Sequence, residues 1–467
     1  MNAIIISALM GVLMMFTSII TSNKQVIKNV ALIALLFLLV GNIVDTYNIF
    51  SIKVDTKGML SFGKFGLYFN TLIIAATTIF VLLSGNEIVK TGDYAADYFA
   101  LIFFVLCGIA ILSSFNNLLM MFLGVEIMSI PLYILTGSAK KNLKSNEASL
   151  KYFLMGAFST GIMLMGIALM YGATGSFGIQ AIKLVDNELS FTKVMQTPLL
   201  EVIGLLLVYA AMLFKVSAAP FHFWAPDVYD GAPSAFASFM ATIVKAAGFI
   251  ALINLFFLKA VELHYLWKMV TVLVIITTLI IGNITAVFQQ SVKRMLAYSS
   301  IAHAGFMMFA LYAQNDIAKE GILIYTVAYS LATIGLFAIL AKMDDYSLEG
   351  YNGMAKTQPL LAFANAIFLL SLAGIPLTVG FFAKYYMLAA VLKFSGGFGL
   401  FLTITGVVFA AVSVYYYFRV LQAMYFKEGD AKVADVTVGF KLGLMLCIAA
   451  IIFFGIFPDV LLAWFYF

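Results

Sequence analysis

Long apolar runs alternate with short polar segments along the whole 467-residue chain. About 20 apolar residues wound as an α-helix cross the roughly 30 Å hydrocarbon core of a bilayer. We therefore predict an all-α polytopic membrane protein with about fourteen transmembrane helices. Their approximate cores are 3–21, 29–45, 67–85, 97–114, 116–137, 148–171, 198–228, 234–257, 266–289, 292–313, 319–342, 359–394, 398–425 and 439–465.

The seventh and twelfth of these spans contain helix-breaking sequences. Pro220 interrupts the seventh, and the twelfth carries the run Ala373-Gly374-Ile375-Pro376. A proline inside a helix removes a backbone donor, and such a break persists in a bilayer only where protein or a watery cavity surrounds it. The breaks lie five spans apart, and an odd number of helices per repeat turns the second copy upside down. Paired interruptions of this kind indicate inverted repeats with a transport site at their interface.

The composition excludes a soluble globular protein. Hydrophobic residues make up 63% of the chain and charged residues 10%, with a mean hydropathy of +1.05. The first apolar run, 4–20, lacks a basic flank and a cleavage site, so we expect a retained helix rather than a removed signal. Cys107 and Cys447 both lie in apolar runs and indicate neither a disulfide framework nor a metal site.

The net charge of +5 is carried by lysines in the predicted loops, and we interpret it as a topology signal rather than as nucleic-acid binding. Loops that follow odd-numbered spans are richer in Lys and Arg than the others. They include Lys140, Lys141, Lys144, Lys293 and Arg294. By the positive-inside rule these loops lie on the inner side of the membrane, so fourteen spans put both termini on the outer side.

Four ionisable residues fall deep inside predicted spans: Glu126, Lys215, Lys245 and Lys384. A charge near mid-membrane costs roughly 2.5–3.5 kcal/mol on insertion scales, and such residues usually mark an ion or proton path. The alternative is that they form static ion pairs or neutral, satisfied groups. One glutamate cannot neutralise three lysines, however, so we expect some of these lysines to change protonation state readily.

A Glu126–Lys215 pair could act as a switch if the two residues meet. At about 4 Å and an effective dielectric constant of about 20, their attraction is worth about 4 kcal/mol, and at about 10 Å it is worth about 1.7 kcal/mol. The difference resembles the work of moving one charge through about 100 mV. Repositioning one lysine could therefore drive proton uptake or release.

Three further residues are weaker candidates for proton transfer. His222 lies in the broken seventh span, and His303 lies in the tenth, where either could relay protons or could be a packing residue. Lys151, at the start of the sixth span, either passes protons from the inner side or only pairs with Glu147 four residues before it. Asp227 is adjacent to a proline, which favours helix capping or loop geometry.

One apparent nucleotide motif is rejected. The stretch from Gly58 to Phe65 nearly matches a phosphate-binding loop, but Phe65 replaces the Ser or Thr that holds Mg²⁺, and no strand–loop–helix context surrounds it. No other stretch resembles a nucleotide, flavin or iron–sulfur site. The energy for transport must then come from an ion gradient or from a partner subunit.

Four long stretches resemble the N-type antiporter-like membrane subunit of respiratory complex I, the proton-pumping NADH:quinone oxidoreductase. They are GVEIMSIPLYIL, FKVSAAPFHFWAPDVYDGAP, VKRMLAYSSIAHAGF and SLAGIPLTVGFFAKYYML. The resemblance covers roughly residues 95–425. It implies a glutamate on the fifth helix, here Glu126, and lysines on helices seven, eight and twelve, here Lys215, Lys245 and Lys384.

The resemblance also implies an organisation for the chain. Residues 1–95 would form three N-terminal helices, 96–257 a first antiporter-like repeat, 258–425 a second, inverted repeat, and 426–467 a last helix. It implies no cofactor in this chain, with NADH, FMN, iron–sulfur clusters and quinone belonging to partner subunits. The partners are other membrane-arm subunits and the lipid bilayer, with no nucleic acid, and the location is a bacterial inner membrane.

Two other functions stay open on the sequence. The chain could be an independent secondary cation/proton antiporter, or a structural subunit whose line of buried charges is inert.

Overall fold

The computed structural model describes residues 1–181, 199–258, 265–393 and 398–466, and in these ranges it is helical, with isolated β-bridges and no strand. The long helices before the first break are α1 (Asn2–Ile20), α2 (Lys24–Thr46), α3 (Lys64–Thr91), α4 (Ala95–Leu112), α5 (Leu118–Thr136), α6 (Leu143–Thr174) and α8 (Leu199–Lys215). Beyond it lie α9 (Trp224–Gly231), α10 (Ser234–Phe239), α11 (Lys245–Ile253), α12 (Tyr265–Phe288), α13 (Val292–Ala313), α14 (Asp316–Leu340), α15 (Met354–Thr357), α16 (Pro359–Ala373), α17 (Val379–Lys393), α18 (Gly399–Phe426), α19 (Val438–Ile456) and α20 (Asp459–Tyr466).

The predicted all-α polytopic fold is confirmed. Within the described residues, twelve segments are long and apolar enough to cross a membrane as single helices. The remaining two predicted spans are the ones predicted to be broken, and they are α8 with α9 and α16 with α17. Residues 198 and 394, at the ends of these two predictions, lie outside the described residues. The division into two inverted five-helix repeats stays a prediction.

The last predicted span differs from the structure. The apolar run 439–465 is not one helix, because α19 ends at Ile456 and α20 begins at Asp459. Pro458 lies between them, and proline cannot donate the backbone hydrogen bond that would continue the helix. The high hydropathy of the run on both sides hid this break in the sequence.

Many helices begin at a side chain that accepts a hydrogen bond from the first turn, which satisfies backbone N–H groups that have no partner within the helix. Such caps open α2 (Asn23), α5 (Asn117), α6 (Asn142), α13 (Ser291), α14 (Asn315) and α19 (Thr437). The polar residues between apolar runs therefore fix where these six helices start.

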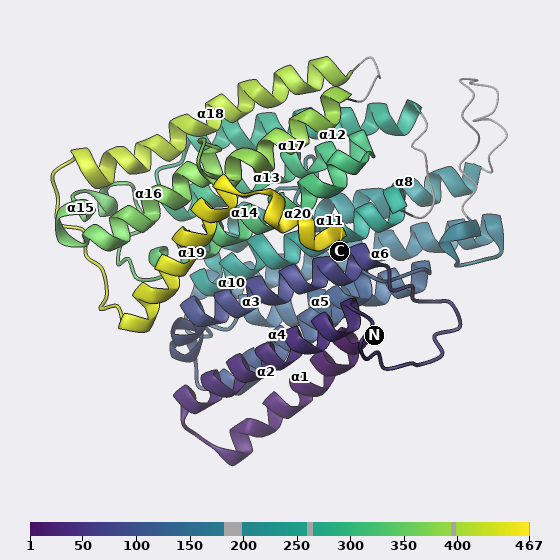
Figure 1. Ribbon diagram of the computed structural model, residues 1–467, viewed down its shortest axis with the longest axis horizontal. Helices are drawn as coiled ribbons and strands as arrows, with labels where there is room; N and C mark the ends of the chain where they lie inside the picture. Colours follow the sequence, from purple (N-terminus) through teal and green to yellow (C-terminus); the bar gives the residue numbers. More distant parts are fainter. Residues whose placement is uncertain (182–198, 259–264, 394–397, 467) are drawn as a thin grey trace.

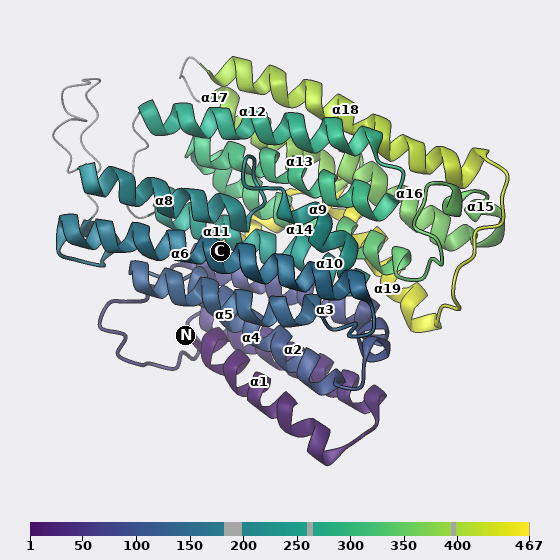
Figure 2. The same cartoon turned by 180° about the vertical axis from the view of Figure 1, so that it is seen from behind.

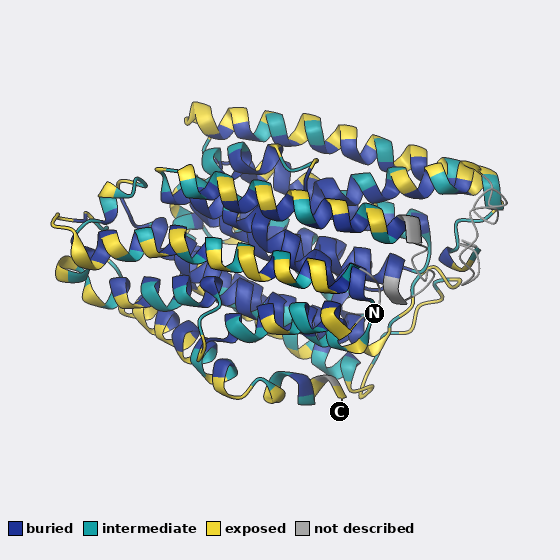
Figure 3. Cartoon of the chain, turned by 90° about the horizontal axis from the view of Figure 1, so that it is seen from above, coloured by how far each residue is buried: buried dark blue, intermediate teal, exposed yellow. Residues whose placement is uncertain are grey.

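The core of the bundle lies around α10, α11, α13 and α14. Figures 1 and 2 show these helices in the middle, with α1 and α18 at opposite edges. In Figure 3 the exposed residues form stripes along the peripheral helices, while the central helices are almost entirely buried. Charged side chains on the central helices are therefore enclosed by protein.

Both termini lie on one side, as the fourteen-span prediction requires. The Met1 ammonium pairs with Asp45 Oδ2 at 2.6 Å near the end of α2, and the Tyr466 hydroxyl contacts the Glu320 carboxylate near the start of α14. The end of an even-numbered span and the start of an odd-numbered span lie on the same side of the membrane.

At the first break, residues 216–223 leave the helix, and several backbone groups there find partners outside the helical pattern. The amide of Ala218 donates to the carbonyl of Leu213 at 2.9 Å, and the indole of Trp224 donates to the carbonyl of Phe214 at 2.9 Å. The amide of Ala219 donates to Thr278 Oγ1 at 2.9 Å. The break thus persists because α12 and the start of α9 replace the missing helical partners.

At the second break, Gly374 ends α16 with a φ of +84°, a conformation that side chains rarely adopt. The amides of Gly374 and Ile375 both donate to the carbonyl of Leu370 at 3.0 Å. A Cβ at Gly380, in the first turn of α17, would lie 1.8 Å from the carbonyl oxygen of Ser371, so the two half-helices touch through backbone there.

A buried ion pair joins the N-terminal helices to the loop after α14. Lys342 Nζ lies 2.5 Å from Glu87 Oε1, and the two side chains are 6% and 20% exposed. Lys90, 64% exposed, pairs with the same carboxylate at 3.0 Å. The buried partner carries the greater energetic weight, because removing one member of a buried pair leaves an uncompensated charge.

We expect Lys342→Met to destabilise the folded subunit by about 2 kcal/mol, since the Glu87 carboxylate then keeps only its exposed partner, Lys90. Thermal dissociation of the subunit from its purified assembly measures this. Lys90→Met, at the exposed partner of the same carboxylate, should cost less than about 1 kcal/mol. Equal losses for the two variants would contradict the assignment.

Candidate functional site

Glu126 and Lys215 lie on neighbouring helices but do not form a direct ion pair. Glu126 is partly exposed on α5, whereas Lys215 is buried in the last turn of α8. Lys215 Nζ donates to Ser129 Oγ at 2.9 Å and to the Tyr133 hydroxyl at 3.4 Å. Glu126, Ser129 and Tyr133 share one face of α5, and Glu126 lies one turn before Ser129. The charge of Glu126 still acts on Lys215 from there.

The position of Lys215 in the last turn of α8 favours a cation, because the C-terminal end of a helix carries a partial negative charge. The same principle applies to Lys384, whose ammonium reaches the end of α16. Each break therefore supplies a helix terminus that partly offsets the cost of burying a lysine.

Lys245 is 1% exposed and lies at the point where a π-helical turn, Met240–Val244, gives way to α11. Single π-helical turns inside α-helices often occur at functional sites. Lys245 Nζ donates to the Ser300 carbonyl on α13 at 2.7 Å and also contacts Ser300 Oγ. No carboxylate within ion-pair distance faces this ammonium among the described residues.

His303 lies on α13, one turn beyond Ser300, and both of its ring nitrogens have partners. Nδ1 lies 2.6 Å from the Tyr325 hydroxyl, and Nε2 lies 3.1 Å from the Tyr417 hydroxyl. The Tyr329 ring packs against the imidazole with centroids 4.8 Å apart. The histidine is therefore held by α14 and α18 in an orientation in which hydroxyl groups can exchange protons with it.

Lys384, on α17, is buried and points back across the second break. Its Nζ donates to the Ala373 carbonyl at the end of α16 at 2.8 Å and to Ser413 Oγ on α18 at 3.1 Å. The Phe306 ring centroid is 5.2 Å away. A Cβ at Gly374 would lie 2.9 Å from Lys384 Cδ, so the glycine also makes room for the lysine stem.

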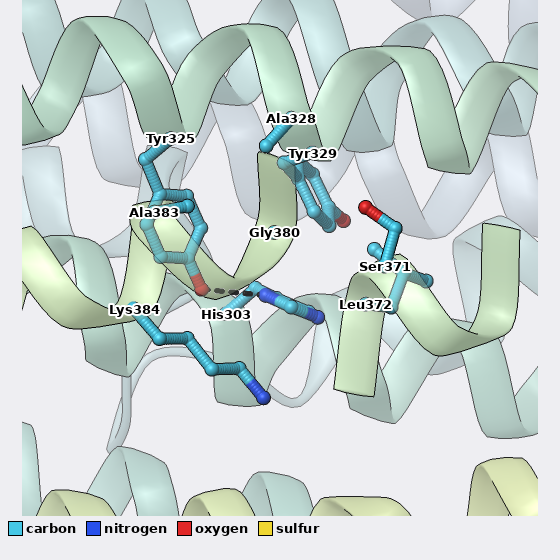
Figure 4. Close-up of a pocket in the computed structure, with 9 residues that line it drawn as sticks. All are labelled: His303, Tyr325, Ala328, Tyr329, Ser371, Leu372, Gly380, Ala383 and Lys384. Carbon is cyan, nitrogen blue, oxygen red and sulfur yellow. Dashed lines mark hydrogen bonds between the residues drawn. The ribbon is translucent and has the colours of Figure 1, made fainter. Parts of the chain in front are cut away.

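A small cavity joins His303 to Lys384. Its volume is only about 10 Å³, and it is lined by His303, Tyr325, Ala328, Tyr329, Ser371, Leu372, Gly380, Ala383 and Lys384. Figure 4 shows the imidazole in the middle of the polar members of this lining. The hydroxyl of Ser371 is buried without a hydrogen-bond partner in the described structure. Such groups are normally satisfied by ordered water, and this cavity is about as small as one that holds a single water.

Polar side chains follow one another from Lys245 to Lys384, with a ring contact rather than a hydrogen bond between Tyr329 and His303. Lys245 contacts Ser300, the hydroxyls of Tyr229 and Tyr329 interact with Ser300, and Tyr329 leads to His303 and to the cavity beside Lys384. The charges of Lys245 and Lys384 both act on His303. We call this set of groups the Lys245–Lys384 network.

Lys215 and Lys245 are not linked by polar groups in the way that Lys245 and Lys384 are. No hydrogen bond joins the two lysines in the described residues, and an apolar contact lies next to both of them. A Cβ at Gly248 would lie 2.6 Å from Val216 Cγ1. The hydrogen bonds of these four residues therefore define two groups, the Glu126–Lys215 group and the Lys245–Lys384 network.

His222 and Lys151 lie apart from both groups. His222 is half-buried in the first break, near the Pro220 backbone. Lys151, 44% exposed, pairs with Glu147 Oε1 at 2.7 Å and with Asp227 Oδ2 at 3.3 Å. Asp227 also accepts from Arg294 Nη2 at 3.1 Å. Lys151 is thus part of a surface ion cluster on the predicted inner side.

The sequence did not single out several groups that the structure brings into the site. They are Tyr229, Lys293, Ser300, Tyr325, Tyr329 and Tyr417. Helical spacing could have pointed to some of them, since Lys293, Ser300 and His303 recur about every one or two turns on α13. In the described residues, no group of three or more His, Cys, Asp and Glu side chains is placed to hold a metal ion.

Comparison with known proteins identifies the family. Residues 115–410 match the family described as NADH:quinone oxidoreductase/Mrp antiporter, TM. The NADH-quinone oxidoreductase subunit N of Cytophaga hutchinsonii is 37% identical and that of Flavobacterium psychrophilum 36% identical, each alignment covering 99% of both chains.

Solved structures give the same result for the fold. A chain of respiratory complex I from Thermus thermophilus with bound aureothin superposes with a TM-score of 0.82 at 29% identity, over 99% of this chain and 98% of that one. A chain of the Mrp complex from Dietzia shares the fold, with a TM-score of 0.81 at 18% identity, over 99% of this chain and 96% of that one. The chain therefore belongs to the NADH:quinone oxidoreductase/Mrp antiporter family, as an N-type antiporter-like membrane subunit of complex I.

Proposed function

We propose that protons cross this subunit through the Lys245–Lys384 network, with Lys245 as the central relay. Lys215 is the switching partner of Glu126, and Lys384 is the relay toward the outer side or a neighbouring subunit. The observation that carries the proposal is the run of hydroxyl, imidazole and amine groups from Lys245 through Ser300 and His303 to the cavity at Lys384. Buried ionisable groups that face protein and a cavity are typical of proton paths.

The chain acts within a larger assembly. It is a proton-translocating subunit of NADH-quinone oxidoreductase in the bacterial inner membrane, and its partners are other membrane-arm subunits. NADH, FMN, iron–sulfur clusters and quinone belong to partner subunits in this proposal. Redox chemistry there drives proton movement here through changes in charge or conformation.

The Glu126–Lys215 group supplies the charge change in this proposal. In the structure the Lys215 ammonium rests on Ser129 and Tyr133, about one helical turn from Glu126. Moving it from about 8 Å to about 4 Å from the carboxylate gains about 2 kcal/mol at an effective dielectric constant of about 20. Two positions of Lys215 with energies this close would let a modest external change shift its protonation.

The domain organisation belongs to the same proposal. Residues 96–257 and 258–425 form two inverted repeats, and each contributes one broken helix whose first half ends beside a lysine, Lys215 in α8 and Lys384 at α16. Inverted repeats of this kind place a transport site where the two copies meet. Lys245, at the contact of α11 with α13, lies between the two breaks along the chain.

Purification from native membranes tests the function. Co-isolation of this chain with flavin and iron–sulfur subunits, and loss of NADH-driven proton pumping when its gene is deleted, is the expected result. Reconstitution of the isolated chain in vesicles tests the alternative. Sodium/proton exchange by this chain alone, without the other subunits, would instead make it an independent antiporter.

A further inference from the structure

A further buried lysine, Lys293, lies at the start of α13 and contacts the end of α9. Its side chain is 4% exposed, and Nζ donates to the carbonyls of Asp230 at 2.8 Å and Ala232 at 2.7 Å. The Tyr346 ring centroid is 5.4 Å away. These carbonyls belong to the C-terminal end of a helix, so they hold a cation without holding a second ionisable group.

The charged groups around Lys293 leave its ammonium without a carboxylate of its own. The Asp230 carboxylate is directed to Arg294 Nη1 at 4.0 Å. Asp230 attracts the Lys293 charge and Lys144 repels it, each from beyond ion-pair distance. An ammonium held only by carbonyls and a ring loses its proton more easily than one held by a carboxylate.

Lys293 is buried next to a surface ion cluster, because it contacts the carbonyl of Asp230, a member of that cluster. The cluster consists of Glu147 and Lys151 of α6, Asp227 and Asp230 of α9, and Arg294 of α13. Its members are 28–64% exposed, so they are in contact with water. Lys293 and Arg294 are adjacent in sequence, so their side chains leave α13 in different directions. Arg294 faces this cluster, and Lys293 is buried.

The end of α9 links Lys293 to the first groups of the Lys245–Lys384 network. Tyr229 precedes Asp230, whose carbonyl accepts from Lys293, and the Tyr229 hydroxyl interacts with Ser300. Ser300 accepts from Lys245. Lys293 and Ser300 are seven residues apart on α13, which is roughly 10 Å along the helix axis.

We propose that Lys293 is the group through which protons pass from the inner aqueous side to Lys245, by way of Tyr229 and Ser300. The Lys293 ammonium releases one proton toward the Tyr229 hydroxyl, which passes its own proton to Ser300, which passes its own to the neutral Lys245 amine. Lys293 then regains one proton from water at the surface ion cluster, so one proton is taken up for each one delivered. This inference rests on the proposed function and assigns proton uptake to Lys293 in place of Lys151.

If Lys293 only caps the end of α9, the arginine variant should pump protons normally. Lys293→Arg keeps the positive charge and the donors to both carbonyls, but arginine does not deprotonate in proteins. Lys293→Gln keeps one donor group and removes the charge. Lys356→Arg is the matched control, because Lys356 is exposed on the same predicted side, in α15.

The experiment measures protons pumped per NADH oxidised by the intact assembly in vesicles, together with the amount of assembled complex. We expect Lys293→Arg and Lys293→Gln to assemble and to lose as much pumping as Lys245→Ala, with Lys356→Arg unchanged. The inference is overturned if either variant pumps normally, or if both fail to assemble, since Lys293 is then only structural. Normal pumping by Lys245→Ala would overturn the proposed function instead.

Discussion

Lys245→Ala in the intact assembly is expected to lower proton translocation through this subunit by at least about tenfold, because positioned proton-transfer groups typically contribute roughly 10²- to 10⁴-fold. Lys245 is the buried amine that joins α11 to Ser300 on α13. Without it, the nearest amine or imidazole in the network is His303, one turn beyond Ser300. Fewer protons pumped per NADH oxidised, measured in sealed vesicles, is the observable.

Two further variants separate a relay from a structural role at this position. Lys245→Arg keeps the charge and a donor for the Ser300 carbonyl but cannot release a proton, so we expect it to fail in pumping as alanine does. Lys427→Ala removes an exposed lysine after α18 and should leave pumping unchanged. Unchanged pumping per NADH in Lys245→Ala would favour a line of charges that is inert.

The sequence predicted the parts of the site that depend on hydropathy and on proline. Lys215 and Lys384 stand out because a charge in an apolar run is rare, and each lies beside a helix break that the sequence shows directly. The structure explains the association, since the ammonium group of each lysine lies at the C-terminal end of a half-helix. A buried cation and a helix end stabilise each other.

The parts that the sequence did not predict depend on which helices meet. Nothing in the residues around Glu126 shows that Ser129 and Tyr133, rather than the carboxylate, would hold Lys215. Serine and tyrosine are common in apolar helices, so Ser300 and Tyr417 acquire meaning only when α13 and α18 are packed together.

Charges at helix ends are ambiguous in a similar way. Lys293 follows one apolar run and Lys342 ends another, so both look like loop residues, yet both are buried. Lys342 is enclosed because the loop after α14 packs on α3, where Glu87 pairs with it. Lys293 is enclosed because α9 ends over the first turn of α13. Only tertiary contacts between distant segments decide such cases.

Lys384→Met is expected to lower proton translocation by about as much as Lys245→Ala while leaving the assembly intact. Methionine is unbranched and flexible, so it can follow the path of the lysine stem past Gly374 and toward Phe306. What is lost is the amine that contacts Ala373 and Ser413 and lines the cavity beside His303. Protons that reach His303 then have no titratable group at the second break, and protons pumped per NADH should fall in sealed vesicles.

Ser413→Ala is the matched control for this variant. It removes one of the two hydrogen bonds to the Lys384 ammonium and keeps the Ala373 carbonyl as acceptor. One such bond is worth about 1 kcal/mol, so pumping should change by no more than about fivefold. A loss in Ser413→Ala as large as that in Lys384→Met would mean that the geometry around the amine, rather than its proton, limits transport. Normal pumping by Lys384→Met would remove Lys384 from the path and end the network at His303.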